Sequence, residues 1–134
     1  MRQFSIPVRV YIEDTDVGGI VFYANYLKFM ERARTECLRH AGVNLDQLHR
    51  LHRRLFVVRS VVVDYHIPAR YDDQLTVSAN IMTFRPASIE MEQPIHRGDE
   101  LLISSNVRLA CVDADTLTPK AIPTVLKEAM IREQ

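Results

Sequence analysis

The sequence lacks several features that mark common classes of protein. It has no excess of either charge, because 17 lysine and arginine residues balance 17 aspartate and glutamate residues. A protein that binds nucleic acid over a broad surface normally carries a positive excess, so the balance argues against that class and leaves only a local anion site open. No apolar stretch approaches the length of about 20 residues that crosses a bilayer, so we expect no transmembrane segment.

Cysteine is also scarce. The only two cysteines, Cys37 and Cys111, are isolated and form no C-x-x-C pair. Residues 1–7 lack the apolar segment of about 7–15 residues that defines a secretory signal. Two free thiols without an export signal fit a reducing compartment, so we expect a cytoplasmic protein.

A metal site is not expected either. Of the five histidines, only His49 and His52 are adjacent at helical spacing, and no thiol ligand lies near them in the sequence. A structural or surface role therefore fits the histidines better than metal binding. The dense basic cluster over residues 49–54 is interpreted in the same way, as the solvated end of a helix.

What the chain does contain is typical of one globular domain. It has 134 residues, of which 47% are hydrophobic and 25% charged. A chain of this size buries about two-thirds of its unfolded surface, enough for one core without metal or disulfide staples. We expect residues 1–134 to form a single domain.

Apolar periodicity predicts the helices. Residues at three- and four-residue steps predict a long helix over residues 26–41, with Asn25 as its N-cap and Gly42 as its stop. A shorter helix is expected over residues 44–51 with Asn44 as its cap, and a terminal helix over residues 123–132.

Strand patterns fill the rest of the chain. Alternating apolar residues predict a strand over residues 4–13, and further strands are expected over residues 55–67, 74–84, 88–96 and 100–112. The last three are close enough in sequence to form an antiparallel meander. The order of one strand, a long helix and a run of strands predicts an α+β fold in which one sheet packs on one helix.

The strongest chemical signal precedes the long helix. Asp14 and Asp16 are followed by Gly18 and Gly19 and then by the helix start. A helix N-terminus presents unpaired backbone N–H groups and about half a positive charge, so it can hold an oxygen that becomes anionic during a reaction. A nearby carboxylate could attack a carbonyl or deprotonate a water that does so.

The same residues also permit simpler interpretations. Asp16 can equally end a strand and hold a turn through hydrogen bonds from its own side chain. A calcium loop is excluded, because Gly18 stands where an EF-hand needs a polar ligand and Asn25 stands where it needs a bidentate glutamate.

Residues 9–26, which contain Asp-Thr-Asp-Val-Gly-Gly-Ile-Val, resemble the signature of hot-dog-fold acyl-CoA thioesterases of the 4-hydroxybenzoyl-CoA thioesterase type. Residues 27–40 are more similar to the branch of that family associated with the Tol–Pal system, and residues 56–59, 71–73 and 111–113 agree. The resemblance implies a long central helix wrapped by a curved antiparallel sheet of about five strands.

The resemblance also implies a reaction, the hydrolysis of acyl-CoA thioesters to a free acid and CoA. Asp16 would act as nucleophile or general base, and backbone N–H groups near Tyr23, at the helix start, would form the oxyanion hole. The Tol–Pal branch often has a histidine at the position of Tyr23, but a backbone role does not depend on the side chain. An ionised carboxylate needs no partner base, which suits a sequence in which no serine–histidine or cysteine–histidine pair stands out.

The substrate-binding residues implied by the resemblance fall into three groups. Gly19, Val21 and Asn25 would contact the substrate beside Asp16. Residues Phe56, Val57 and Val58 would line the acyl pocket of a partner subunit, and Arg85 and Ser88 would lie near the nucleotide end of CoA. Because CoA is part of the substrate, no separate cofactor is expected.

The expected assembly is a homodimer or homotetramer with active sites shared between subunits, and an acyl carrier protein is an alternative thioester donor. Two other functions remain open. A hot-dog hydratase or dehydratase usually needs a histidine with an acidic residue, and no histidine lies within residues 14–26. A non-catalytic acyl-carrier-protein or envelope-complex adaptor would keep the fold without turnover.

Overall fold

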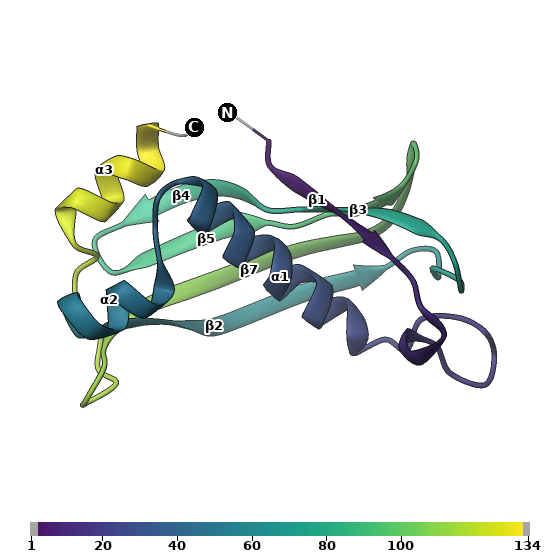
Figure 1. The fold of residues 1–134 in the computed structure, drawn as a ribbon, viewed down its shortest axis with the longest axis horizontal. Helices are drawn as coiled ribbons and strands as arrows, with labels where there is room; N and C mark the ends of the chain where they lie inside the picture. The colour runs from purple at the N-terminus through teal and green to yellow at the C-terminus, as the bar shows by residue number, and fades with distance from the viewer. Residues whose placement is uncertain (1–2, 133–134) are drawn as a thin grey trace.

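A computed structural model describes residues 3–132, which form a sheet of seven strand segments and three α-helices (Figure 1). In chain order the elements are β1 (Ser5–Arg9), the 3₁₀ turn η1 (Ile12–Asp14), α1 (Asn25–His40), α2 (Leu45–His52), β2 (Arg54–Tyr65), β3 (Gln74–Ser78), β4 (Asn80–Arg85), β5 (Ser88–Glu92), β6 (Ile95–Arg97), β7 (Glu100–Asp113) and α3 (Thr124–Arg132). None of these helices is long and apolar enough to span a bilayer.

The sheet is antiparallel, with the order β1-β3-β6-β7-β5-β4 and with β2 paired to the other side of β7. Two pairs of segments continue each other: β3 leads into β4 through Ala79, and β5 into β6 through Gln93 and Pro94. Counted in this way the sheet has about five strands, and the predicted meander is confirmed because residues 74–85, 88–97 and 100–113 are neighbours in the sheet.

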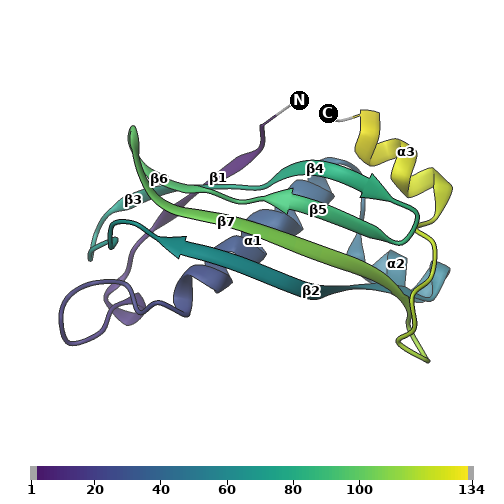
Figure 2. The same ribbon diagram turned by 180° about the vertical axis from the view of Figure 1, so that it is seen from behind.

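The long helix α1 lies across one face of this sheet (Figures 1 and 2). The side chains that it buries recur at the predicted spacing, and they are Tyr26, Phe29, Met30, Ala33, Cys37 and Leu38. They belong to the same core as buried residues of the sheet such as Val77, Met91 and Val107. The predicted α+β arrangement of one sheet on one central helix is therefore confirmed.

A buried polar group links this helix to the sheet where β5 is interrupted. The Gln93 side chain is fully buried, and its Nε2 donates to the backbone oxygens of Met30 at 2.9 Å and Ser78 at 3.2 Å. Its Oε1 accepts from Arg34 Nη1 at 3.1 Å. Because a buried amide is costly to leave unpaired, these bonds fix where α1 lies along the sheet.

Three predicted boundaries are wrong for local reasons. The first strand ends at Arg9, because Asp14 Oδ2 accepts from the Tyr11 N–H at 2.8 Å and folds residues 11–14 into η1. The first two meander segments are each divided in two. Pro94 has no N–H for the ladder, and the Ala79 N–H donates to Phe4 O at 2.9 Å.

Candidate active site

The loop between η1 and α1 folds back on itself around Asp16. The Asp16 N–H donates to Ile20 O at 3.0 Å, and the Gly19 N–H donates to Asp16 O at 3.0 Å. The carboxylate Oδ1 accepts from the Gly18 N–H at 2.8 Å, which is the hydrogen bond of an Asx turn. The side chain is exposed, and its Oδ2 makes no hydrogen bond within residues 3–132. One oxygen of Asp16 therefore shapes the loop while the other is available for chemistry.

Gly19 has a conformational role in this loop. Its φ angle is +76°, in the left-handed region that residues with a Cβ rarely adopt. Its N–H and C=O are both used, by Asp16 O and by the Tyr71 N–H. The position therefore requires glycine whether or not it also contacts a substrate.

We expect Gly19→Ala to reduce acyl-CoA turnover and to lower the free energy of unfolding by about 1–2 kcal/mol, the usual cost of a left-handed residue with a Cβ. Gly98→Ala is the matched control, because Gly98 also has a positive φ of +59° and neither added Cβ meets an atom within 4 Å. Urea denaturation and initial-rate assays compare the two. Equal turnover in both variants would contradict the role assigned to Gly19.

The start of α1 differs from the prediction. Asn25 was expected as the N-cap, but Ala24 holds that position without a side-chain hydrogen bond and Asn25 is the first helical residue. Its Nδ2 instead donates to Asp14 O at 2.9 Å, and the Phe22 N–H donates to the same oxygen at 3.1 Å. An asparagine side chain can donate as well as accept, and here it ties the helix start to η1.

Backbone donors, among them those of Tyr23 and Ala24, remain free at this helix start. Within residues 3–132 the N–H groups of Tyr23 and Ala24 make no hydrogen bond. Unpaired N–H groups at the positive end of a helix can stabilise a developing oxyanion. They follow Asp16 in the same loop, seven and eight residues further along the chain, and their use as oxyanion donors stays a prediction.

An apolar cavity of about 200 Å³ lies beside these groups. Its walls include Val21 from the loop, Tyr23 and Tyr26 from the helix start, and Tyr65 from the end of β2. The Tyr65 hydroxyl donates to Tyr23 O at 3.2 Å, and the Tyr26 oxygen accepts from the Ala69 N–H at 2.9 Å. Burial raises the pKa of both Tyr26 and Tyr65, so both phenols stay uncharged at neutral pH. The cavity is suited to an uncharged group.

The structure separates the remaining predicted residues from this site within one chain. Phe56, Val57 and Val58 are on β2, but Tyr65 lies seven residues beyond Val58, a distance of about 23 Å along a strand. Arg85 and Ser88 pair in the β4–β5 turn, at the end of the sheet near α3 and opposite the Asp16 loop (Figure 1).

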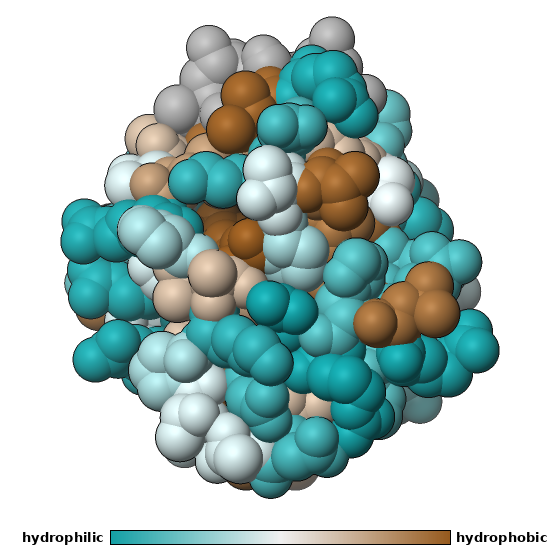
Figure 3. Space-filling model, turned by 90° about the vertical axis from the view of Figure 1, so that its left-hand side faces the viewer, coloured by the Kyte–Doolittle hydropathy of each residue, from teal (hydrophilic) through white to brown (hydrophobic). Residues whose placement is uncertain are grey.

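That opposite end is mostly hydrophilic, with separate hydrophobic patches (Figure 3). Its basic residues bind local acceptors: Arg50 pairs with Asp46 at 2.8 Å, Arg53 pairs with Asp115, and Arg54 Nε donates to Ala121 O at 2.7 Å. These contacts agree with the interpretation of residues 49–54 as a solvated helix end.

A serine–histidine pair that the sequence did not reveal lies between β7 and the residue after β2. His66 Nε2 and Ser104 Oγ lie 2.9 Å apart. Ser104 is in register with Asp64 inside the sheet, where its own backbone N–H belongs to the ladder and is not free to hold an oxyanion. The pair therefore joins β2 to β7 and does not have the arrangement of a serine hydrolase.

Comparison with known proteins identifies the family. Residues 18–104 match the model of the thioesterase superfamily. The chain belongs to that superfamily. It is 42% identical to the acyl-CoA thioesterase YbgC of Haemophilus influenzae over 126 residues, which cover 94% of this chain and 93% of that protein. The acyl-CoA thioester hydrolase YbgC of Escherichia coli is 43% identical over 121 residues, covering 90% of each chain.

A solved structure shows the same fold. The probable thioesterase from Bartonella henselae superposes with a TM-score of 0.86 at 34% identity, covering 91% of this chain and all of that one. The family resemblance and the hot-dog fold are thus confirmed for this thioesterase. The match to the superfamily begins after Asp16, so the role of that carboxylate stays a prediction supported by the loop geometry.

Proposed function

We propose that this thioesterase hydrolyses acyl-CoA thioesters to a free acid and CoA, with Asp16 as its catalytic carboxylate. The observation that carries the proposal is the loop before α1, which contains a free Asp16 oxygen and the unpaired N–H groups of Tyr23 and Ala24. The apolar cavity of about 200 Å³ beside it offers room for the acyl group. The reaction agrees with the names of relatives that are 42–43% identical.

The chemistry needs one group to deliver oxygen and one to hold negative charge. The thioester carbonyl oxygen accepts hydrogen bonds from the N–H groups of Tyr23 and Ala24, each worth about 2.7–4 kcal/mol in comparable sites. Asp16 Oδ2 attacks the carbonyl carbon, or takes a proton from a water that attacks it. The tetrahedral intermediate then breaks its C–S bond, and CoA leaves as a thiolate that gains a proton. In the nucleophilic case, water hydrolyses the resulting anhydride.

The outer edge of β2 supports a dimeric assembly. Within residues 3–132, β2 pairs only with β7, and its exposed apolar residues are Val57, Val58, Val61, Val62 and Tyr65. A long apolar edge of this kind is a template for pairing with another chain. If two copies pair antiparallel about Val61, the residue four positions before it lies opposite the residue four positions after it, so Val57 of the partner subunit faces Tyr65.

This arrangement explains the separation seen in one chain. Antiparallel pairing brings residues 56–58 of the partner subunit, from the far end of β2, to the Asp16 end. We therefore propose that a homodimer completes each site, with Phe56, Val57 and Val58 contributed across the interface. The predicted contacts of Arg85 and Ser88 with CoA belong to the same proposal, because one chain holds them far from its own Asp16.

We expect Val61→Pro to convert the dimer to a monomer and to lower turnover. The backbone N–H of His66 donates to Leu102 across the β2–β7 ladder, and by alternation the Val61 N–H points to the open edge. Proline at an edge position removes that donor without breaking the sheet. Val61→Ala, which keeps the N–H, is the control. Light scattering measures the mass, and a Val61→Pro protein that stays dimeric would contradict this pairing.

A cytoplasmic location is proposed because both cysteines are buried as free thiols, which fits a reducing compartment. Association with the Tol–Pal system is proposed only from the resemblance of residues 27–40. Cell fractionation tests the first, and co-purification with envelope proteins tests the second.

A substrate panel tests the proposed function. Saturated and aromatic acyl-CoA thioesters, an acyl carrier protein thioester and an enoyl-CoA are incubated with the protein, and free thiol and water addition are both measured. Thiol release from saturated or aromatic acyl-CoA supports the proposal. Water addition to the enoyl thioester without thiol release would identify a hydratase, and no reaction with any substrate would favour an adaptor; either outcome overturns the proposal.

A further inference from the structure

The Asp16 loop rests on a second turn, formed by residues 69–73. The Val21 N–H donates to Ala69 O at 2.9 Å, and the Tyr71 N–H donates to Gly19 O at 3.3 Å. Between these bonds, Ile20 and Arg70 form an isolated antiparallel bridge. Residues 19–21 therefore add a short strand to the turn 69–73. Because the Asp16 N–H is bonded to Ile20 O, the position of Asp16 follows the position of that turn.

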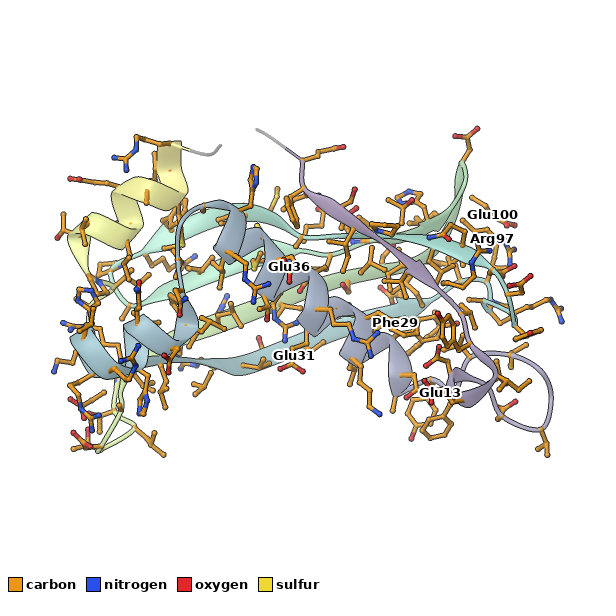
Figure 4. The ribbon with its side chains drawn as sticks, in the orientation of Figure 1. Glu13, Phe29, Glu31, Glu36, Arg97 and Glu100 are labelled. Carbon is orange, nitrogen blue, oxygen red and sulfur yellow. The ribbon has the colours of Figure 1, made fainter. Side chains whose placement is uncertain are left out.

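The turn 69–73 is held in place by Asp73 and Arg97. Asp73 Oδ2 accepts from the Arg70 N–H at 2.8 Å and from Arg97 Nη1 at 2.6 Å. Arg97 Nε also donates to Glu100 Oε1 at 3.0 Å, so the guanidinium bridges two carboxylates. Figure 4 shows Arg97 and Glu100 at the end of the sheet on the side where the Asp16 loop lies.

The surroundings of Asp73 stabilise its ionised carboxylate. Burial alone would raise the pKa of its carboxyl, but the hydrogen bonds from Arg70 and Arg97 outweigh burial and hold that pKa below its usual value. Asp73 therefore remains ionised throughout the neutral range, and the bridge to Arg97 is present there.

The turn also carries backbone strain. Asp72 has a φ of +70°, in the left-handed region, which costs about 1–3 kcal/mol where the surrounding structure enforces it. The enforcing contacts are the Asp72 N–H bond to Val10 O and the Val10 N–H bond to Asp73 O, both 2.9 Å. The turn is thus fixed on one side by Val10, the residue after β1, and on the other by the Asp73–Arg97 pair.

We propose that Asp73 and Arg97 are positioning residues, which hold the Asp16 loop in its reactive geometry through the turn 69–73. This proposal rests on the proposed function, because its main effect is measured as the rate of acyl-CoA hydrolysis. An ion pair near the surface contributes little to global stability, about 0–1 kcal/mol. A shift of about 1 Å in a reacting group can nevertheless reduce catalysis about 100-fold, so the effect of losing the pair falls on turnover.

The test compares Arg97→Gln with the matched control Arg108→Gln. Arg108 forms a longer ion pair with Glu90, at 3.7 Å, between β5 and β7 and away from the turn. We expect Arg97→Gln to lower kcat about tenfold or more while KM stays within about twofold. Its thermal midpoint should match that of Arg108→Gln, and Arg97→Lys, which keeps the positive charge, should recover part of kcat.

Amide hydrogen exchange supplies a readout that does not depend on catalysis. The N–H groups of Val21 and Tyr71 form the two hydrogen bonds between the loop and the turn. We therefore expect both amides to exchange faster in Arg97→Gln than in the wild type, and at the wild-type rate in Arg108→Gln. Wild-type exchange together with wild-type kcat in Arg97→Gln would overturn the proposal. A thermal midpoint far below that of Arg108→Gln would overturn it too, because the pair would then support the whole fold.

Failure of the proposed function can be told apart from failure of this inference. Asp16→Asn is assayed in parallel, and full turnover in that variant would remove Asp16 from the mechanism whatever Arg97 does. In that case, faster amide exchange at Val21 and Tyr71 in Arg97→Gln would still support the proposal that the Asp73–Arg97 pair positions the loop. Unchanged exchange would overturn that proposal.

Discussion

Asp16→Asn is expected to lower the turnover of acyl-CoA by about 10²–10⁴-fold, the usual contribution of a positioned acid–base group, and to leave the thermal midpoint near that of the wild type. An amide is neither a nucleophile nor a base at neutral pH. The asparagine oxygen can still accept the 2.8 Å hydrogen bond from the Gly18 N–H, so the loop keeps its turn. The side chain is exposed, so the substitution leaves no buried group unpaired.

The matched control for this prediction is Asp14→Asn. Asp14 belongs to the same segment, and its Oδ2 accepts from the Tyr11 N–H, a bond that asparagine can also keep. Initial rates of thiol release and thermal unfolding are measured for both variants. If Asp16→Asn hydrolysed acyl-CoA as fast as Asp14→Asn, the assignment of Asp16 would be wrong.

The second large effect is expected for stability. Phe29→Ala should lower the free energy of unfolding by about 3–5 kcal/mol, because it removes a large side chain from a packed core and leaves a cavity. Phe29 is 1% exposed, and its ring packs edge-on against Tyr26 with centroids 6.2 Å apart. The guanidinium carbon of Arg32 lies over the Phe29 ring, 5.8 Å from its centroid. Figure 4 shows Phe29 near the start of α1, close to the loop that α1 supports.

Urea denaturation measures this loss, and Phe22→Ala is the control. Phe22 lies just before α1 but is 44% exposed, so its truncation removes little buried surface and should cost much less. Equal losses in the two variants would contradict the packing described for α1.

The helices and the order of the strands could be predicted because their signals are local. The apolar spacing along α1 is visible in the sequence, and Asn44 caps α2 as expected, accepting from the Asp46 and Gln47 N–H groups. One error was avoidable, since Pro94 lies inside a predicted strand and cannot join a ladder through its nitrogen. The Asn25 error was less avoidable, because an amide side chain can serve a helix start as acceptor or as donor.

The site itself could be predicted only in part. The carboxylate and the helix start belong to one short segment of the sequence, so both could be named as candidates from the chain alone. The contribution of Tyr65 and of the turn 69–73 depends on tertiary pairing between segments about 40–50 residues apart, which has no local signal. The family resemblance includes Tyr71, Asp72 and Asp73, and the contacts of Asp73 with Arg70 and Arg97 supply the physical reason for that turn.

The most direct test of the central claim is a crystal structure of Asp16→Asn with an unhydrolysed acyl-CoA bound. We expect the thioester carbonyl oxygen to lie about 2.7–3.1 Å from the backbone nitrogen of Tyr23 or Ala24, with the carbonyl carbon facing residue 16 and the acyl group in the cavity lined by Tyr26 and Tyr65. A thioester bound elsewhere, with those N–H groups left facing solvent, would contradict it.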